Sequence, residues 1–307
     1  MQNSRRSTKI KAHIVNGFTA GSKGGNPAGV VLDADKLDEK DMLRIAKKVG
    51  LSETAFVSKS KTEGFKLDFF TPNMRIAHCG HATVAAFSFL AELGRVPEGE
   101  TSKETVDGPR KIIIKEGAAY MEQKAPKYCT SKEWASADVT NSAVLNSLGL
   151  TEEDLDTRVG PMLVSTGNSF MVVGVKNSDI LKGILPDQDA IAEISEKLDL
   201  IGYYVFTTDT SETEHDATTR MFAPRYAIPE ESATGMAAGP LACLLHDYLD
   251  LKRDVIIIDQ GHFMKPASPS IINVDLAIKD GKITGLMAGG YGRPMKEMEI
   301  DLETAVS

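Results

Sequence analysis

Apolar residues recur along the chain in short alternating or helical patterns, which glycine, proline and asparagine separate. Alternation predicts a strand over residues 12–18 and a half-buried strand over 65–70 that ends at Thr71-Pro72. A helix is predicted between Asp38 as its N-cap and Gly50 as its stop. Its apolar positions have helical spacing: Met42, Ile45, Ala46 and Val49. The chain therefore mixes strands and helices, as an α+β protein does.

Two further helices are predicted to be apolar on every side, and each follows a polar turn. The turn Cys79-Gly80-His81 leads into a small-residue helix that ends near Leu93-Gly94, and residues 230–239 lead into a second one. The N–H groups of a first helical turn have no partner inside the helix, so they bind what lies in front of them. Two such N-termini that face each other would form a site between two lobes.

The order of these landmarks occurs twice along the chain. A Gly-Asn loop, an apolar strand, a helix, a strand ending in proline, a turn and a buried helix follow one another in each half. Gly167-Asn168 repeats Gly25-Asn26, and Met221 to Pro224 repeats Phe69 to Pro72. A solenoid needs more repeats than two, so the pattern predicts a duplication into two pseudo-symmetric α+β lobes. The polar run 122–141 is the predicted link between them.

Composition narrows the class of protein. With 307 residues the chain can form two domains, and 42% hydrophobic with 25% charged residues is an ordinary globular mixture. A net charge of -8 argues against nucleic acid and anionic membranes as partners. Three cysteines without a disulfide framework, and a polar start without an apolar h-region, predict a cytoplasmic protein. The apolar stretch 82–91 meets Glu92 before it is long enough to cross a membrane.

Four ordered motifs resemble the PhzF-like isomerases of the phenazine-biosynthesis family. They are Gly24-Gly25-Asn26-Pro27-Ala28, Leu51-Ser52-Glu53-Thr54-Ala55-Phe56, Cys79-Gly80-His81-Ala82-Thr83 and residues 233–239. The resemblance implies the diaminopimelate-epimerase-like fold: two lobes, each a mostly antiparallel, barrel-like sheet around a central helix, with the active site in the cleft between them. It also implies a homodimer. The expected domains are residues 1–124, with 288–307 returning to them, and residues 125–287.

The resemblance also suggests site residues. It implies that Glu53 transfers the proton and that Glu231 is a supporting acid. It also implies that His81, which follows the glycine of the helix start, is catalytic and donates a proton or orients the substrate; the alternative is that His81 only caps the helix. Where the family more often has Asp-Pro, this chain has Glu231-Ser232, and Met236 stands where serine is common. These departures bear on the substrate more than on the fold.

The residues themselves offer two chemistries for moving a proton at carbon. A carboxyl group in apolar surroundings can take up a proton and return it, and Glu53 lies among Leu51, Ala55 and Phe56. Alternatively, Cys79 at a helix start could act as a thiolate, as in the related two-cysteine epimerases. Those enzymes need a second thiol, and Ser232 occupies the corresponding place. This disfavours a symmetric two-thiol racemase.

No cofactor or metal is expected. His78, Cys79 and His81 resemble part of a metal site, but a structural zinc site needs four ligands and no second ligand pair has matching spacing. Gly24-Gly25 lacks the Gly-Lys-Ser/Thr ending of a phosphate loop.

The favoured hypothesis is a cofactor-independent isomerase in which Glu53 moves a proton on a small carboxylate substrate. The backbone N–H groups near Gly80, His81, Gly235 and Met236 would hold that carboxylate, with Ser232 beside them. Two alternatives stay open. One is a Cys79-dependent epimerase of an amino or hydroxy acid, and the other is a non-catalytic metabolite-binding or interaction protein on the same fold.

Overall fold

The structure is a computed structural model that describes residues 6–134, 137–210 and 215–304. These residues form two compact units. The first unit contains residues 6–22, 26–121 and 290–304, and the second unit contains residues 23–25 and 122–289 apart from the two gaps. The predicted domains, with boundaries at 124/125 and 287/288, are units that would each fold independently. Compactness does not test independent folding, so these boundaries stay predictions.

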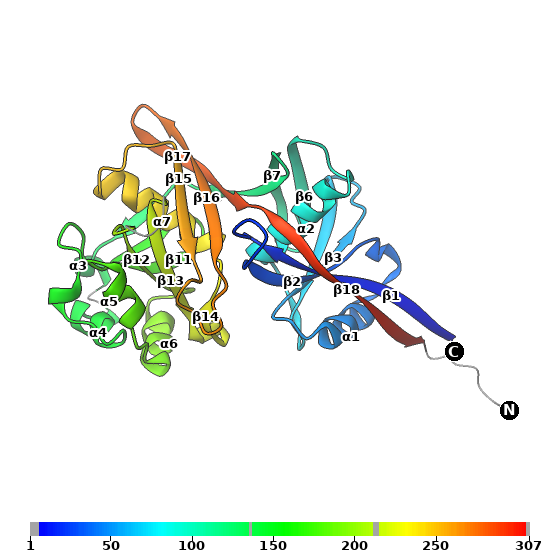
Figure 1. The fold of residues 1–307 in the computed structure, drawn as a ribbon, viewed down its shortest axis with the longest axis horizontal. Helices are drawn as coiled ribbons and strands as arrows, with labels where there is room; N and C mark the ends of the chain where they lie inside the picture. Colours follow the sequence, from blue (N-terminus) through cyan, green and yellow to red (C-terminus); the bar gives the residue numbers. More distant parts are fainter. Residues whose placement is uncertain (1–5, 135–136, 211–214, 305–307) are drawn as a thin grey trace. The chain divides into compact units, whose positions relative to one another are not determined.

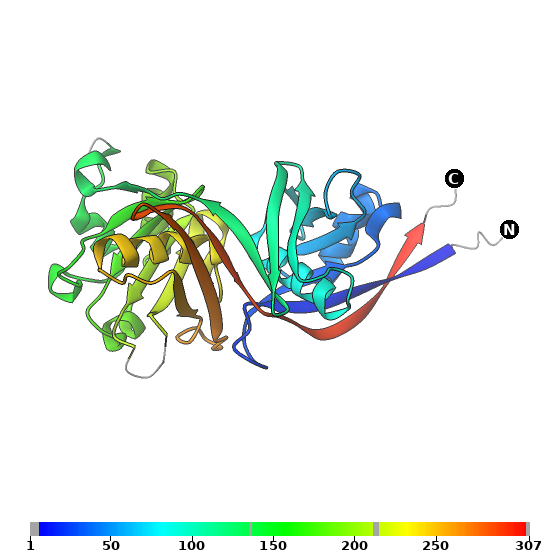
Figure 2. The same ribbon diagram turned by 90° about the horizontal axis from the view of Figure 1, so that it is seen from above.

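The first unit is a mostly antiparallel sheet. Its strand order is β18-β1-β2-β3-β4-β6-β7-β8, with the short β5 also paired to β4. Only the pairs β2–β3 and β4–β6 are parallel. Figures 1 and 2 show β1 and β18 side by side, although they come from opposite ends of the chain. The strands are β1 (Arg6–Gly17), β2 (Asn26–Val31), β3 (Thr54–Ser58), β4 (Phe65–Phe70), β5 (Arg75–Ile76), β6 (Gly99–Thr105), β7 (Gly108–Lys115), β8 (Ala118–Lys124) and β18 (Gly292–Thr304).

The helices of the first unit follow the predicted signals. Helix α1 (Glu39–Val49) begins after Asp38, whose side chain accepts a hydrogen bond from the N–H of Asp41, and it ends at Gly50 with φ of 71°. It buries its four predicted apolar positions. Helix α2 (Gly80–Glu92) is buried from Gly80 to Leu90. An apolar surface all round is typical of a helix inside a core.

Two glycines let α2 lie close to the sheet. Gly17 on β1 and Gly292 on β18 face each other in the strand register. A Cβ atom at Gly17 would lie 2.9 Å from the carbonyl oxygen of His81, and one at Gly292 would lie 2.8 Å from Cβ of Ser88. Both distances are too short for a real side chain, so the glycines set how closely the start of α2 approaches β1 and β18.

The second unit repeats this arrangement. Its sheet order is β9-β10-β11-β12-β13-β15-β16-β17, with the short β14 also paired to β13, and only β11–β12 and β13–β15 are parallel. The strands are β9 (Lys127–Cys129), β10 (Met162–Ser165), β11 (Ser169–Gly174), β12 (Gly202–Thr207), β13 (Ala217–Ala223), β14 (Ile228–Glu231), β15 (Val255–Gln260), β16 (Ser270–Lys279) and β17 (Lys282–Gly290). The α-helices are α3 (Ser131–Trp134), α4 (Asn141–Asn146), α5 (Ser178–Gly183), α6 (Gln188–Lys197) and α7 (Gly235–Tyr248).

The predicted duplication is visible in the strand pairings. The series antiparallel, parallel, antiparallel and parallel runs from β1 through β2, β3 and β4 to β6, and again from β10 through β11, β12 and β13 to β15. Helix α1 and helix α6 occupy the same place in each series, and so do α2 and α7. Each parallel pair needs such a crossover, because a tight hairpin cannot join parallel strands.

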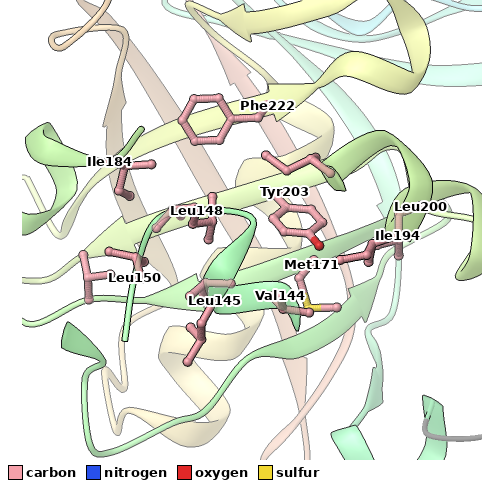
Figure 3. Close-up of a cluster of buried hydrophobic side chains, with 14 of the residues drawn as sticks. Val144, Leu145, Leu148, Leu150, Met171, Ile184, Ile194, Leu200, Tyr203 and Phe222 are labelled. Atoms are coloured by element: carbon pink, nitrogen blue, oxygen red, sulfur yellow. The ribbon is translucent and has the colours of Figure 1, made fainter. Parts of the chain in front are cut away.

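A large apolar core supports the second unit on one side of its sheet. Figure 3 shows Val144 and Leu145 of α4 and Ile194 of α6 gathered around Met171, Tyr203 and Phe222 of the sheet. Tyr203 and Phe222 belong to paired positions on β12 and β13. Short helices α4 and α5 carried too few apolar positions for the sequence to predict them.

Two details of the first unit differ from the sequence interpretation. The strand over 65–70 is not half-buried, because Asp68 is only 5% exposed. It is stabilised there by ion pairs with Arg75 and Lys66, the latter 3.2 Å from Nζ to Oδ2. Strand β6 was not predicted at all, because its sequence, Gly-Glu-Thr-Ser-Lys-Glu-Thr, has no apolar alternation.

Among the described residues, no helix has the length and apolar character needed to cross a membrane.

Candidate active site

Glu53 is held by the sheet of the first unit. It immediately precedes β3, and its carbonyl oxygen accepts a hydrogen bond from the N–H of Gly29 at 2.9 Å, which continues the parallel pairing with β2. Its side chain is 13% exposed. Oxygen Oε2 is inaccessible and accepts no hydrogen bond from the described residues. A buried carboxylate oxygen without a hydrogen bond costs free energy, so such a position is typical of a functional group.

Cys79 and His81 stand at the start of α2. Cys79 is the N-cap residue, with an extended backbone at φ of -144°, and its side chain makes no capping bond. Its thiol is therefore available for other contacts. His81 is the second helical residue and is 6% exposed, as is Cys79. The sequence predicted both residues at this helix start, and the structure places them there.

The three side chains form one cluster with the imidazole in its centre. Nε2 of His81 lies 3.3 Å from Oε2 of Glu53, and Nδ1 of His81 lies 3.5 Å from Sγ of Cys79. Each end of the cluster therefore contacts a different ring nitrogen. A neutral imidazole has one N–H and one bare nitrogen, so it can accept a proton from one end and pass its own to the other.

This arrangement suits proton transfer better than metal binding. The donor atoms of Glu53, Cys79 and His81 lie within 4.8 Å of one another, which is close enough to be considered as a metal-ligand set. A histidine binds a metal ion through one nitrogen, whereas here the ring lies between its two partners. The cluster resembles the nucleophile, base and carboxylate geometry of general acid–base sites.

The predicted site residues of the second unit gather at the start of α7. Glu231 ends β14, and its Oε2 accepts a hydrogen bond from Oγ1 of Thr234, the N-cap residue of α7. Gly235 is the first helical residue, as Gly80 is in α2. Met236 follows it, and its sulfur accepts a hydrogen bond from Nδ2 of Asn168 at 3.2 Å. Gly235 and Met236 therefore occupy the places of Gly80 and His81, whereas Thr234, and not Ser232 as predicted, occupies the place of Cys79.

Gln260 organises this second helix start, and sequence reasoning missed it. Its Oε1 accepts hydrogen bonds from the N–H of Thr234 at 3.1 Å and from the hydroxyl of Tyr204 at 2.9 Å. Its Nε2 donates to the carbonyl oxygen of Glu231 at 2.6 Å. Gln260 is fully buried, so these bonds fix the turn from Glu231 to Thr234. A glutamine at the end of an apolar strand was the only local signal.

Ser232 has a structural partner. Its hydroxyl donates to the carbonyl oxygen of Gly25 at 3.1 Å, and Ser268 donates to the same oxygen at 2.7 Å. The N–H of Gly25 in turn donates to the carbonyl oxygen of Pro269 at 3.1 Å. The Gly24-Gly25 loop is therefore fastened to the turn before α7. The predicted contact of Ser232 with substrate stays a prediction.

Gly24→Ala is expected to lower the free energy of unfolding by more than about 2 kcal/mol. Gly24 has φ of +66°, and a Cβ atom there would lie 1.8 Å from the carbonyl oxygen of Pro269. Gly21→Ala is the matched control, because Gly21 has φ of +63° and open space around the new atom. Urea denaturation measures the free energy of unfolding of both variants. The loss in Gly21→Ala reports backbone strain alone, and the additional loss in Gly24→Ala reports the clash with Pro269. Equal losses would contradict the proposed close approach.

Comparisons with known proteins find similarity over most of the chain. The family model "Phenazine biosynthesis-like protein" (PhzC-PhzF) matches residues 15–289. The chain belongs to the PhzC-PhzF family. The sequence resemblance to this family is therefore confirmed, and so is the expected two-lobe, diaminopimelate-epimerase-like fold.

Two relatives named as isomerases match most of the chain. "Uncharacterized isomerase YfhB" of Bacillus subtilis strain 168 is 33% identical over 80% of this chain and 83% of its own length. "Uncharacterized isomerase YddE" of Escherichia coli strain K12 is 30% identical over 89% of this chain and 92% of its own. A crystal structure of a PhzF-family phenazine biosynthesis protein from Bacillus anthracis has a TM-score of 0.84 at 27% identity, covering 95% of this chain and 99% of that one.

One residue near the cluster of this PhzC-PhzF protein was not predicted from sequence. Lys103 on β6 is 0% exposed and extends beneath the start of α2. Its Nζ donates to Oγ1 of Thr83 at 2.5 Å and lies 3.0 Å from Nδ1 of His78. A lysine in a polar strand is usually exposed to solvent, so the residue type indicated an exposed side chain and not a buried one.

The burial of Lys103 should couple folding to pH. Burial lowers its pKa well below the 10.5 of an unfolded lysine. Between these two pKa values the unfolded chain holds one more proton, so a rise in pH through that window stabilises the folded state. We expect the unfolding free energy of wild type minus that of Lys103→Met to rise as the pH approaches 10.5. Urea denaturation from neutral pH to about pH 10 measures this difference.

The exposed Lys59 provides the control for this measurement. The stability of Lys59→Met should run parallel to that of wild type over the same pH range. Parallel curves for Lys103→Met as well would contradict the lowered pKa of Lys103.

Proposed function

We propose that this protein is an isomerase that moves a proton on a small carboxylate substrate by general acid/base catalysis, without a cofactor. Glu53 is the residue that takes and returns the proton. The observation that carries the proposal is the buried Oε2 of Glu53, which accepts no hydrogen bond from the described residues and lies 3.3 Å from Nε2 of His81. The relatives named as isomerases support the reaction class.

The geometry supports a division of roles within the cluster. In this proposal Glu53 acts on the substrate carbon, and His81, whose Nε2 lies 3.3 Å from Oε2 of Glu53, assists the proton transfer. Such a carboxyl can act as base and then as acid, because the imidazole stabilises whichever form it takes. The N–H groups of Gly80 and His81 are proposed to bind the substrate carboxylate, because they lie at the start of α2 and helix starts favour anions. In the second unit, Glu231, Ser232, Gly235 and Met236 are proposed to contribute to substrate binding, with Glu231 as a supporting acid.

A second candidate is an epimerase that depends on Cys79. The observation in its favour is the 3.5 Å distance between Sγ of Cys79 and Nδ1 of His81. In this reaction the thiol would give its proton to Nδ1 while Nε2 gives its proton to Glu53, so the number of protons in the cluster is unchanged. The thiolate would then abstract the proton from carbon.

Proton NMR in deuterated water distinguishes these candidates. Wild type, Glu53→Gln and Cys79→Ser are incubated with a panel of hydroxy, amino and cyclic unsaturated carboxylates. Deuterium that enters at carbon with wild type and not with Glu53→Gln supports the first proposal. Exchange that survives in Glu53→Gln and is lost in Cys79→Ser moves the chemistry to the thiol. A compound that binds without any exchange favours the metabolite-binding alternative.

The homodimer and the cytoplasmic location are also part of this proposal. The first rests on the family resemblance alone, and the second rests on the sequence. Sedimentation of the purified protein tests the first of them. A monomer at all concentrations would remove the homodimer without affecting the chemistry proposed for Glu53.

A further inference from the structure

Lys103 is a buried amine with polar partners but with no carboxylate partner among the described residues. It is 0% exposed, and none of the described carboxylates forms an ion pair with it. Its Nζ also lies 5.0 Å from the centre of the Phe69 ring on β4. Moving an ammonium group out of water is costly, and lysines that are fully buried are nearly always paired. A lysine retained in this position therefore calls for a reason other than stability.

The two hydrogen-bonding contacts of Lys103 lie around the start of α2, which carries Cys79 and His81. Thr83, which accepts from Nζ, donates its own hydroxyl hydrogen to the carbonyl oxygen of Cys79 at 2.6 Å. His78, the second partner, directly precedes Cys79. Lys103 therefore holds the turn on both sides of the thiol. Because Cys79 is the N-cap residue of α2, a lysine that fixes the backbone before and after Cys79 also fixes the residue at which α2 begins.

Two titratable groups, Arg110 and Cys79, act on the charge of Lys103, and a third, His78, contacts its Nζ. Arg110 lies opposite Lys103 in the register of β6 and β7, and it lowers the pKa of Lys103 further than burial alone. His78 has its pKa lowered to about 2 by burial and by the charges of Lys103 and Arg110, so it is neutral and its Nδ1 accepts. Cys79 acts the other way, because a thiolate there favours the ammonium form of Lys103.

We propose that Lys103 is a positioning residue for the Glu53–His81–Cys79 cluster: through Thr83 and His78 it fixes the turn at the start of α2, so that its amine responds to the charge of the Cys79 thiol. The inference rests on the proposed function only in taking this cluster as the reacting site. Lys103 itself does not reach substrate, because it is fully buried. It acts on the reaction through the residues that it contacts.

The test follows the protonation of Lys103 itself and needs no substrate. Protein labelled with ¹³C-lysine is titrated by NMR, and the signal missing from Lys103→Met identifies Lys103. Lys103→Arg gives the same assignment if the methionine variant does not fold. We expect the Lys103 signal to titrate below the other lysines in wild type, and lower still in Cys79→Ser, because the anion that favours the ammonium has been removed.

Cys129→Ser is the matched control, because Cys129 lies on β9 in the second unit. It should leave the Lys103 titration unchanged. A merely structural lysine would titrate alike in wild type, Cys79→Ser and Cys129→Ser, and that result would overturn the proposal. A Lys103 signal that titrates with the exposed lysines would overturn it as well.

The outcome is separable from that of the proposed function. If Lys103 responds to Cys79→Ser while deuterium exchange does not depend on Glu53, the coupling of Lys103 to the thiol stands and the role of Glu53 fails. If exchange depends on Glu53 and Lys103 ignores Cys79→Ser, the proposed function stands and this inference fails.

Discussion

Glu53→Gln is expected to slow deuterium exchange at the substrate carbon by about 10²- to 10⁴-fold, the usual contribution of a positioned general base. The amide keeps the shape of the side chain beside His81 but cannot take up a proton. The fold should therefore survive, with a melting temperature close to that of wild type by circular dichroism. The exchange rate is measured by proton NMR under identical conditions for both proteins.

Two further variants sharpen this result. Glu92→Gln makes the same change at the exposed last residue of α2 and should exchange at the wild-type rate. Glu53→Asp keeps the carboxylate but shortens the arm by one methylene, so it should retain more activity than the amide and less than wild type. If Glu53→Gln turns over at the wild-type rate, the assignment of the base is wrong.

Arg220→Met is expected to lower the free energy of unfolding by about 3 to 5 kcal/mol, the usual loss when one partner of a buried ion pair is removed. The side chain of Arg220 is 9% exposed, and its Nε and Nη2 donate to the two carboxylate oxygens of Glu230 at 2.8 and 2.9 Å. Its Nη1 also donates to the carbonyl oxygen of Ile184 at 3.0 Å. Methionine would leave Glu230 as an unpaired, largely buried charge.

Arg95→Met is the control that isolates the effect of burial on the stability of an ion pair. Arg95 also makes a two-point contact with a carboxylate, that of Asp33, but both side chains are substantially exposed. Its loss should cost less than about 1 kcal/mol. Urea denaturation gives both values, and adding Glu230→Gln to Arg220→Met should restore part of the stability. Equal losses for the two arginines would show that the Arg220 pair is not the buried contact described above. Because Glu230 adjoins Glu231, this pair also supports the turn before α7.

Several elements could be predicted because their signals are local. Asp38 and Gly50 bound α1 through contacts within a few residues, and four apolar positions at helical spacing define its buried face. The apolar character of α2 and α7 reveals their burial for the same reason. The repeated order of landmarks predicted the duplication that the strand pairings contain. Cys79 and His81 were found because a polar turn before an apolar helix is readable in sequence.

Polar residues in the interior could not be predicted in this way. Strand β6 has no apolar alternation, so neither the strand nor the burial of Lys103 left a pattern. Asp68 and Arg220 likewise look like surface residues until their partners, Arg75 and Glu230, are known. The bond from Ser232 to Gly25 joins residues 207 positions apart, and no local window contains both.

For this protein, the sequence by itself determined the kinds of elements, their doubled order and the candidates Glu53, Cys79 and His81, because periodicity, capping residues and short motifs act over a few residues. Only the tertiary structure decided that His81 presents one nitrogen to Glu53 and the other to Cys79, and that Lys103 lies buried beneath them. Those contacts depend on which strands pair and how closely α2 packs on Gly17 and Gly292, and such long-range packing determines where a polar side chain is buried.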